Sequence, residues 1–138
     1  DGMVPFSFLF GGMDMDNSEF DKAMEAERWL FNYKSTKAGI ESLKEEQKVL
    51  NNDISEMDDS KKITLDLLNS RIKNMQRKIE QIDRALSSLS NIEREIIRYK
   101  CIEGMRYYEF TYKVHMSERQ CMRIKKRALR KINIALGL

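Results

Sequence analysis

Residues 117–131 read SERQCMRIKKRALRK and hold seven Lys or Arg against a single Glu. A helix turns by about 100° per residue, so each side chain can be assigned to one face. With Cys121 as the reference, the apolar face takes Ile124, Ala128, Ile132 and Ala135, flanked by Met122, Leu129 and Leu136. The opposite face takes Arg119, Arg123, Lys126 and Arg130. The stretch therefore predicts an amphipathic helix whose outer face is almost purely cationic.

The residues before this helix have the features of a tight turn between two helices. Ser117 and Gln120 have the spacing of a capping box, in which each side chain bonds a backbone N–H of the other residue. His115 stands at the tight position of the turn, and His is one of the few non-glycine residues that adopt positive φ readily. A short helix from Tyr107 to Val114 is expected to precede the turn.

A third helix is predicted upstream of these two. Ser90 and Glu93 form a second capping box, and Gly104 suits the left-handed position that ends many helices. Residues 89–138 are therefore expected to fold as a three-helix domain that contains a helix-turn-helix motif.

The charge of the chain is divided unevenly. Residues 1–90 carry 13 Lys and Arg against 17 Asp and Glu, whereas residues 91–138 carry 12 against 5. Like charges stacked on a helix face repel one another, and a polyanion would relieve that repulsion. The basic C-terminal third therefore favours nucleic acid as a partner over the alternative of a merely solvated basic face.

Residues 89–132, LSNIEREIIRYKCIEGMRYYEFTYKVHMSERQCMRIKKRALRKI, resemble region 4 of sigma-70-type sigma factors. The shared features are L-S-x-x-E-R-E-I-I, the E-G pair, Y-x-E, and S-x-R followed by R-A-L-R-K. Thr111 and His115 depart from the Ala and Gly usual in that family. Because nothing upstream resembles other sigma regions, the chain is most similar to phage late transcription regulators of the ArpU and RinA kind. This resemblance implies a transcription activator that binds promoter DNA, with RNA polymerase as a possible further partner.

The helix-turn-helix geometry assigns roles to the basic residues, because the second helix of the motif enters the major groove with its N-terminal half. Base reading is assigned to Glu118, Arg119, Met122 and Arg123. Phosphate contact is assigned to Arg106, Tyr107, Tyr108, Lys113, Ser117, Lys126, Arg127 and Arg130. On this assignment, removing the Lys126 side chain weakens binding to all DNA sequences alike.

The first two-thirds of the chain predicts a long antiparallel helical hairpin, assigned to residues 16–88. Helix periodicity runs from Glu19 to about Leu50, with Asn17 or Ser18 as the cap, and a polar turn, NNDISEMDDSK, follows. A coiled-coil-like seam then takes Leu68, Ile72, Met75, Ile79, Ile82, Leu86 and Leu89. The remaining apolar stripe of the hairpin is expected to pack on a second copy or on the C-terminal domain, and the hairpin can be a structural spacer, a dimerisation arm or a partner-docking arm. Homodimerisation is favoured, because one thin seam cannot bury the large residues Phe20, Met24, Trp29, Phe31 and Tyr33.

The remaining features favour an all-α, cytoplasmic protein of a bacterial host, without catalytic residues, metal or other cofactor. Residues 1–15 are expected to be a separate tail, neither signal peptide nor membrane anchor, with Met13 or Met15 as the more natural start. Cys101 and Cys121 have no metal-ligand spacing, and no run reaches the ~18 apolar residues that span a bilayer.

Two other functions stay open: a ring-forming phage DNA-packaging factor similar to small terminases, and a coiled-coil adaptor that binds RNA polymerase or sigma.

Overall fold

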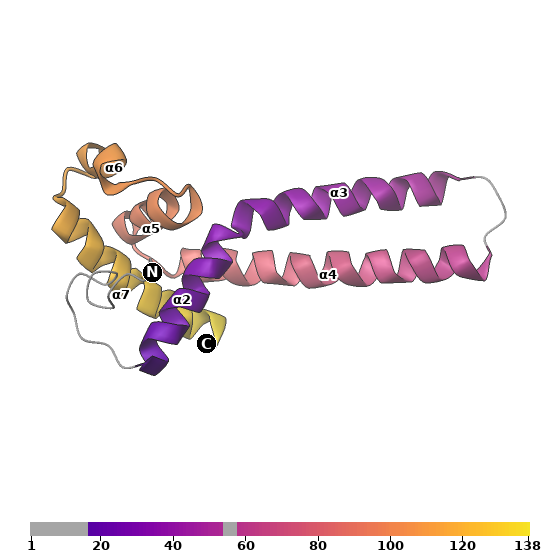
Figure 1. The fold of residues 1–138 in the computed structure, drawn as a ribbon, viewed down its shortest axis with the longest axis horizontal. Coiled ribbons are helices and arrows are strands. Elements are labelled where there is room, and N and C mark those ends of the chain that lie inside the picture. The colour runs from indigo at the N-terminus through magenta and orange to yellow at the C-terminus, as the bar shows by residue number, and fades with distance from the viewer. Residues whose placement is uncertain (1–16, 54–57) are drawn as a thin grey trace, which may run out of the picture.

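The computed structural model describes residues 17–53 and 58–138, and within these ranges all regular structure is helical (Figure 1). This confirms the all-α fold class. The predicted tail, the side chains of the proposed caps Asn17 and Ser18, and residues 54–57 of the polar turn lie outside the described part of the chain. The elements in chain order are α2 (Asn17–Phe31), α3 (Tyr33–Asn52), α4 (Asp59–Ser87), α5 (Asn91–Ile97), the π-helix η1 (Arg98–Ile102), α6 (Tyr107–Val114) and α7 (Glu118–Leu136).

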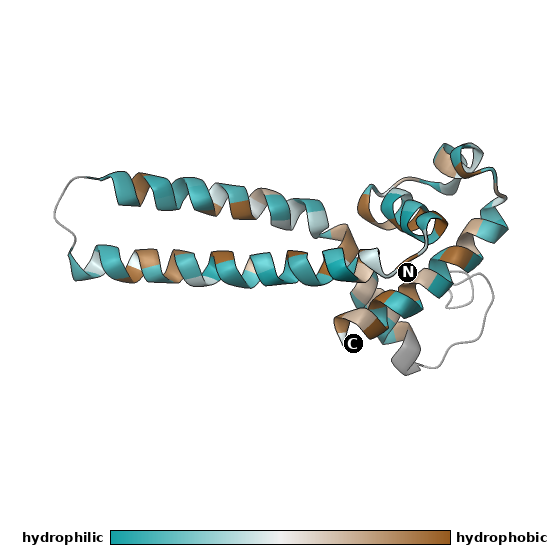
Figure 2. Cartoon of the chain, turned by 180° about the vertical axis from the view of Figure 1, so that it is seen from behind, coloured by the Kyte–Doolittle hydropathy of each residue, from teal (hydrophilic) through white to brown (hydrophobic). Residues whose placement is uncertain are grey.

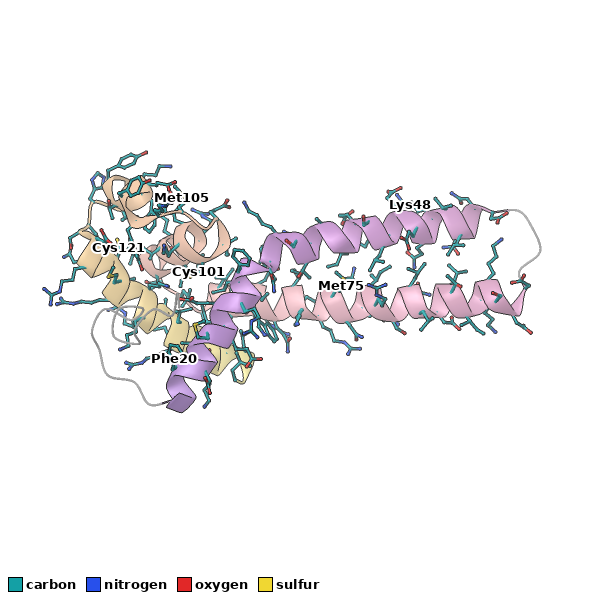
Figure 3. All side chains as sticks on the ribbon, viewed as in Figure 1. Phe20, Lys48, Met75, Cys101, Met105 and Cys121 are labelled. Atoms are coloured by element: carbon teal, nitrogen blue, oxygen red, sulfur yellow. The ribbon has the colours of Figure 1, made fainter. Side chains whose placement is uncertain are left out.

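Helices α3 and α4 lie side by side and run in opposite directions (Figure 1). Their seam holds a buried cluster of Leu43, Leu68 and Ile72, with Leu50 and Met75 packed against it. Gly39 permits a close approach, since a Cβ there would lie 2.8 Å from Met75 Cε (Figure 3). Asp58 caps α4 by accepting a 2.8 Å hydrogen bond from the Lys61 N–H. The predicted seam of α4 thus contacts α3 through Leu68, Ile72 and Met75. Its other residues Ile82, Leu86 and Leu89 pack in a core with the C-terminal helices.

The first predicted helix is divided in two. α2 ends at Phe31 and α3 begins at Tyr33, with Asn32 in a turn between them. The axis of α2 is inclined to those of α3 and α4, and α2 packs on α7 and η1 (Figure 1). Its small buried residues Ala23 and Ala26 allow this close packing. The hairpin proper therefore consists of α3 and α4, whereas the sequence had assigned α2 to it as well.

One shared core joins the hairpin to the C-terminal helices. It contains Leu30 of α2, Ile82 of α4, Ile97 of α5 and Leu129 of α7, and Trp29 and Tyr33 pack against it. A second cluster under the helix-turn-helix contains Ile96, Phe110, Val114 and Cys121. Of the large residues expected at a dimer interface, Trp29 and Tyr33 are thus used within the chain, whereas Met24 and Phe31 remain exposed.

Polar contacts also fix the C-terminal helices to the hairpin. Arg94 of α5 donates from Nε to the Leu86 carbonyl at 3.0 Å and from a terminal nitrogen to the Leu89 carbonyl at 2.9 Å. Leu86 lies in the last turn of α4 and Leu89 follows the end of the helix, where carbonyl groups lack the regular helical partner four residues on. Lys125 of α7 pairs with Glu27 of α2 at 2.6 Å. Polar contacts therefore hold α5 at the end of α4 and α7 against α2, in addition to the apolar packing.

Candidate nucleic-acid interface

A three-residue turn connects α6 to α7. His115 ends α6 in the left-handed conformation, with φ of 53° and ψ of 43°, as its place in the sequence predicted. Ser117 caps α7: its Oγ accepts from the Gln120 N–H at 3.1 Å, while its own N–H donates to Gln120 Oε1 at 3.0 Å. The capping box satisfies backbone groups that a helix start leaves open, so the first turn of α7 is fixed where it meets solvent.

The first two turns of α7 direct their charged side chains outward. Glu118, Arg119 and Arg123 are exposed, and Met122 is half-buried beside them. Among the described residues, neither Arg119 nor Arg123 has an ion-pair or hydrogen-bond partner in the chain. The four residues predicted to read bases thus lie on one accessible surface at the start of the helix.

The buried face of α7 is wider than the apolar pattern indicated. Cys121, Ala128 and Ile132 are buried as expected, but Ile124 is only half-buried and Ala135 is exposed. Leu129 and Leu136, expected at the edge, are buried in the shared core. The reason is that both α2 and α4 pack on α7, and the sequence had placed them in a different domain.

Lys126 is the main correction to the predicted site. The helical pattern places Lys126 among the outward cations, whereas only 4% of this residue is exposed in the structure. Asn133, seven residues along the same side of α7, is buried as well. With its ammonium group below the surface, Lys126 does not belong to the phosphate-contacting set, and replacing it would test folding rather than DNA affinity.

Glu93 binds two cationic side chains of α7, Arg127 and Lys131. This carboxylate is 1% exposed and accepts from Arg127 Nε at 3.2 Å and from Lys131 Nζ at 2.9 Å. It also accepts from the Ser90 N–H at 2.9 Å, in the predicted capping box of α5. Burial alone would raise the pKa of Glu93, but the hydrogen bonds from Lys131, Ser90 and Arg127 outweigh it and lower the pKa to about 2. Arg127 therefore anchors α7 to α5 with part of its guanidinium, a role that the sequence did not show.

The surface continues onto α6. Arg106, Tyr108 and Lys113 are exposed there, as their predicted role requires. Tyr107 is half-buried instead, with its ring centroid 5.7 Å from that of Phe110, and burial raises its pKa to about 12. It is therefore a packing residue of the second core cluster rather than a phosphate contact.

One exposed residue was missed. Tyr112 is exposed one helical turn after Tyr108, so that the two hydroxyl groups lie on one side of α6. The signal that could have identified it is the i,i+4 spacing of these tyrosines on the side of α6 away from Phe110 and Val114. Ser117, Arg127 and Arg130 are the other accessible residues predicted to contact phosphates.

The two cysteines lie in separate parts of the C-terminal core (Figure 3). Cys101 of η1 lines a cavity of about 280 Å³ between α2, η1 and α7, next to the Glu27–Lys125 ion pair. Burial raises the pKa of the Cys101 thiol to about 12, and burial also raises that of Cys121. A protonated, buried thiol is a poor nucleophile and a poor metal ligand, so the cavity offers no evident chemistry.

Comparison with known proteins gives a family but no function. Among the described residues, no helix is both long enough and apolar enough to cross a bilayer. No curated protein and no solved structure matches the chain. The family described as "Protein of unknown function (DUF722)" matches residues 17–134, and the chain belongs to that family.

Proposed function

We propose that the chain is a sequence-specific DNA-binding transcription regulator that acts at the bacterial nucleoid as an activator of phage or prophage late genes. The observation that carries this proposal is the outward pair Arg119 and Arg123 at the capped start of α7. The two cations lie one helical turn apart, and no carboxylate of the described chain neutralises them. Such a helix start fits the major groove, which is about 12 Å wide.

The side-chain types in this surface match the donor and acceptor pattern of base edges. An arginine can donate two hydrogen bonds to O6 and N7 of guanine, and a glutamate can accept from N4 of cytosine. Arg119, Arg123 and Glu118 supply these groups, and Met122 offers an apolar contact for a thymine methyl group. The sequence preference of the protein is therefore expected to depend on these four positions.

Phosphate contacts would come from the rim of the same surface. The accessible candidates are the α6 residues Arg106, Tyr108, Tyr112 and Lys113 and the α7 residues Ser117 and Arg130. Cations and hydroxyl groups bind phosphate oxygens without regard to base sequence, and they fix the orientation of the reading helix. The resemblance to sigma region 4 supports promoter DNA as the target.

Binding to duplex DNA is expected to weaken steeply with salt, because each neutralised phosphate releases counterions. Lys113→Ala is expected to reduce the slope of log affinity against log salt concentration by about 1. Lys48→Ala is the matched control: Lys48 is an exposed lysine far along the hairpin, paired with Glu45 at 3.4 Å (Figure 3). Fluorescence anisotropy with a labelled duplex measures both slopes. Absence of binding at low salt would favour the adaptor function instead, and equal slopes for the two variants would remove Lys113 from the interface.

A further inference from the structure

Three large apolar side chains are exposed near the far end of the hairpin. Val49 of α3 is 70% exposed, and Ile63 and Leu67 of α4 are 60% and 63% exposed. Figure 2 shows hydrophobic residues on both helices toward this end. Ile63 and Leu67 are four residues apart and share one side of α4. These three residues are here called the distal patch.

The pairing of the helices places Val49 beside the other two. The Gln47 side chain donates a hydrogen bond to the Asn69 side chain, so these positions lie opposite each other. Because the helices are antiparallel, Val49 lies across from about residue 67. Val49 directly precedes the seam residue Leu50, and Leu67 directly precedes the seam residue Leu68. In an antiparallel pair of helices, residues one position before the seam point to the same side of the pair. This side of the two-helix pair is here called a flank.

The same flank carries charges of opposite sign on the two helices. Toward the C-terminal domain the distal patch is followed by Glu46 on α3 and Arg71 on α4, both exposed. Neither has an ion-pair partner among the described residues. The opposite flank instead presents Lys48, Lys62 and Lys73 and has no comparable apolar group. Only one flank is therefore suited to association.

We infer that a second copy of this chain covers the distal patch, with the two-fold axis parallel to the hairpin and α3 of each copy on α4 of the other. This arrangement sets Val49 against Leu67 of the partner copy and Glu46 against Arg71 of the partner copy, twice each. An arrangement with α3 on α3 would oppose two Glu46 carboxylates, which is unfavourable. Closed two-fold association of one self-complementary surface is the commonest form of homo-oligomer.

The inferred interface differs from the one that the sequence indicated. The sequence placed dimerisation on the aromatic residues near the start of the chain, of which Trp29 and Tyr33 pack on the shared core. The distal patch lies at the other end of the hairpin. With a lengthwise two-fold axis, both α7 helices lie at the same end of the dimer. Resting on the proposed function, this arrangement predicts two DNA half-sites related by inversion.

Sedimentation equilibrium without DNA tests the interface independently of DNA binding. Over about 1 to about 100 µM the protein is expected to behave as a monomer–dimer equilibrium. Leu67→Glu is expected to weaken association by at least roughly tenfold, since it buries an unpaired charge twice. Ile134→Glu is the matched control, because Ile134 is 80% exposed on α7, which packs at the opposite end of the hairpin from the distal patch. A monomeric wild type over this range, or equal masses for the two variants, overturns the inference; circular dichroism verifies that both variants are folded.

Charge exchange tests the orientation of the two copies. Glu46→Lys and Arg71→Glu are each expected to weaken their own homodimers, because like charges then face each other across the interface. An equimolar mixture of the two variants is expected to recover the dimer, since both contacts then join opposite charges. If the mixture remains as weak as the separate variants, the inferred pairing of α3 with α4 is wrong. These masses do not depend on whether the protein binds DNA.

Discussion

Arg123→Ala is expected to weaken binding to the preferred DNA sequence by about 1–3 kcal/mol and to relax the preference at one base pair. The guanidinium is exposed on the second turn of α7, without an internal partner in the described chain. Its removal should therefore leave the folded structure unchanged while deleting one base contact. Competition binding with all four base pairs at each position of the site measures both quantities.

Lys113→Ala is the control for this experiment. Lys113 is exposed on α6, and the proposed docking assigns it a phosphate contact, so its loss should weaken all sequences by a similar factor. A variant at Arg123 that keeps both the affinity and the base preference of the wild type would show that α7 does not enter the groove as proposed.

Glu93→Gln is expected to lower the free energy of unfolding by about 3 kcal/mol at neutral pH. The substitution removes the negative charge that Arg127 and Lys131 share, and it leaves a neutral amide in a site built for a carboxylate. The loss of stability is smaller than for a fully buried ion pair, because the side chains of Arg127 and Lys131 are also in contact with water. Urea unfolding of the wild type and the variant measures the difference.

This difference is also expected to depend on pH. The pKa of Glu93 falls from 4.5 to about 2 on folding, so the unfolded chain takes up the proton first. The stabilisation is therefore complete above about pH 5 and is lost as the pH falls toward 2. The wild type and Glu93→Gln should converge in stability over that interval. Glu41→Gln, at an exposed glutamate 4.0 Å from Lys44, should remain within about 0.5 kcal/mol of the wild type throughout. A loss at Glu93 no larger than that of Glu41 would contradict the assigned role.

Local sequence signals predicted the local structure well. The capping boxes at Ser90 and Ser117, the left-handed conformations of His115 and Gly104, and the apolar seam of α4 are all present in the structure. Each depends on residues within a few positions of one another, and short-range geometry and helical period determine them.

Contacts between distant segments were not predictable in the same way. The apolar pattern of the first helix was assigned to large residues that include Met24 and Phe31, which are exposed, whereas Ala23, Ala26 and Leu30 form its buried face. The pattern also did not show that this part of the chain packs on α7. The burial of Lys126 has the same origin, because the width of the buried arc of α7 depends on which helices pack on it. Glu93 meets Arg127 and Lys131 from more than thirty residues away, and no spacing rule connects such positions.

Selection of bound sequences from a random duplex DNA pool, run in parallel with wild-type protein and an Arg119→Ala, Arg123→Ala double variant, tests the central claim most directly. The wild type is expected to enrich a defined motif. The double variant, whose substitutions lie on an exposed surface, is expected to remain folded and to enrich no motif. Failure of the wild type to enrich any sequence, or enrichment of the same motif by both proteins, would contradict sequence reading by the start of α7.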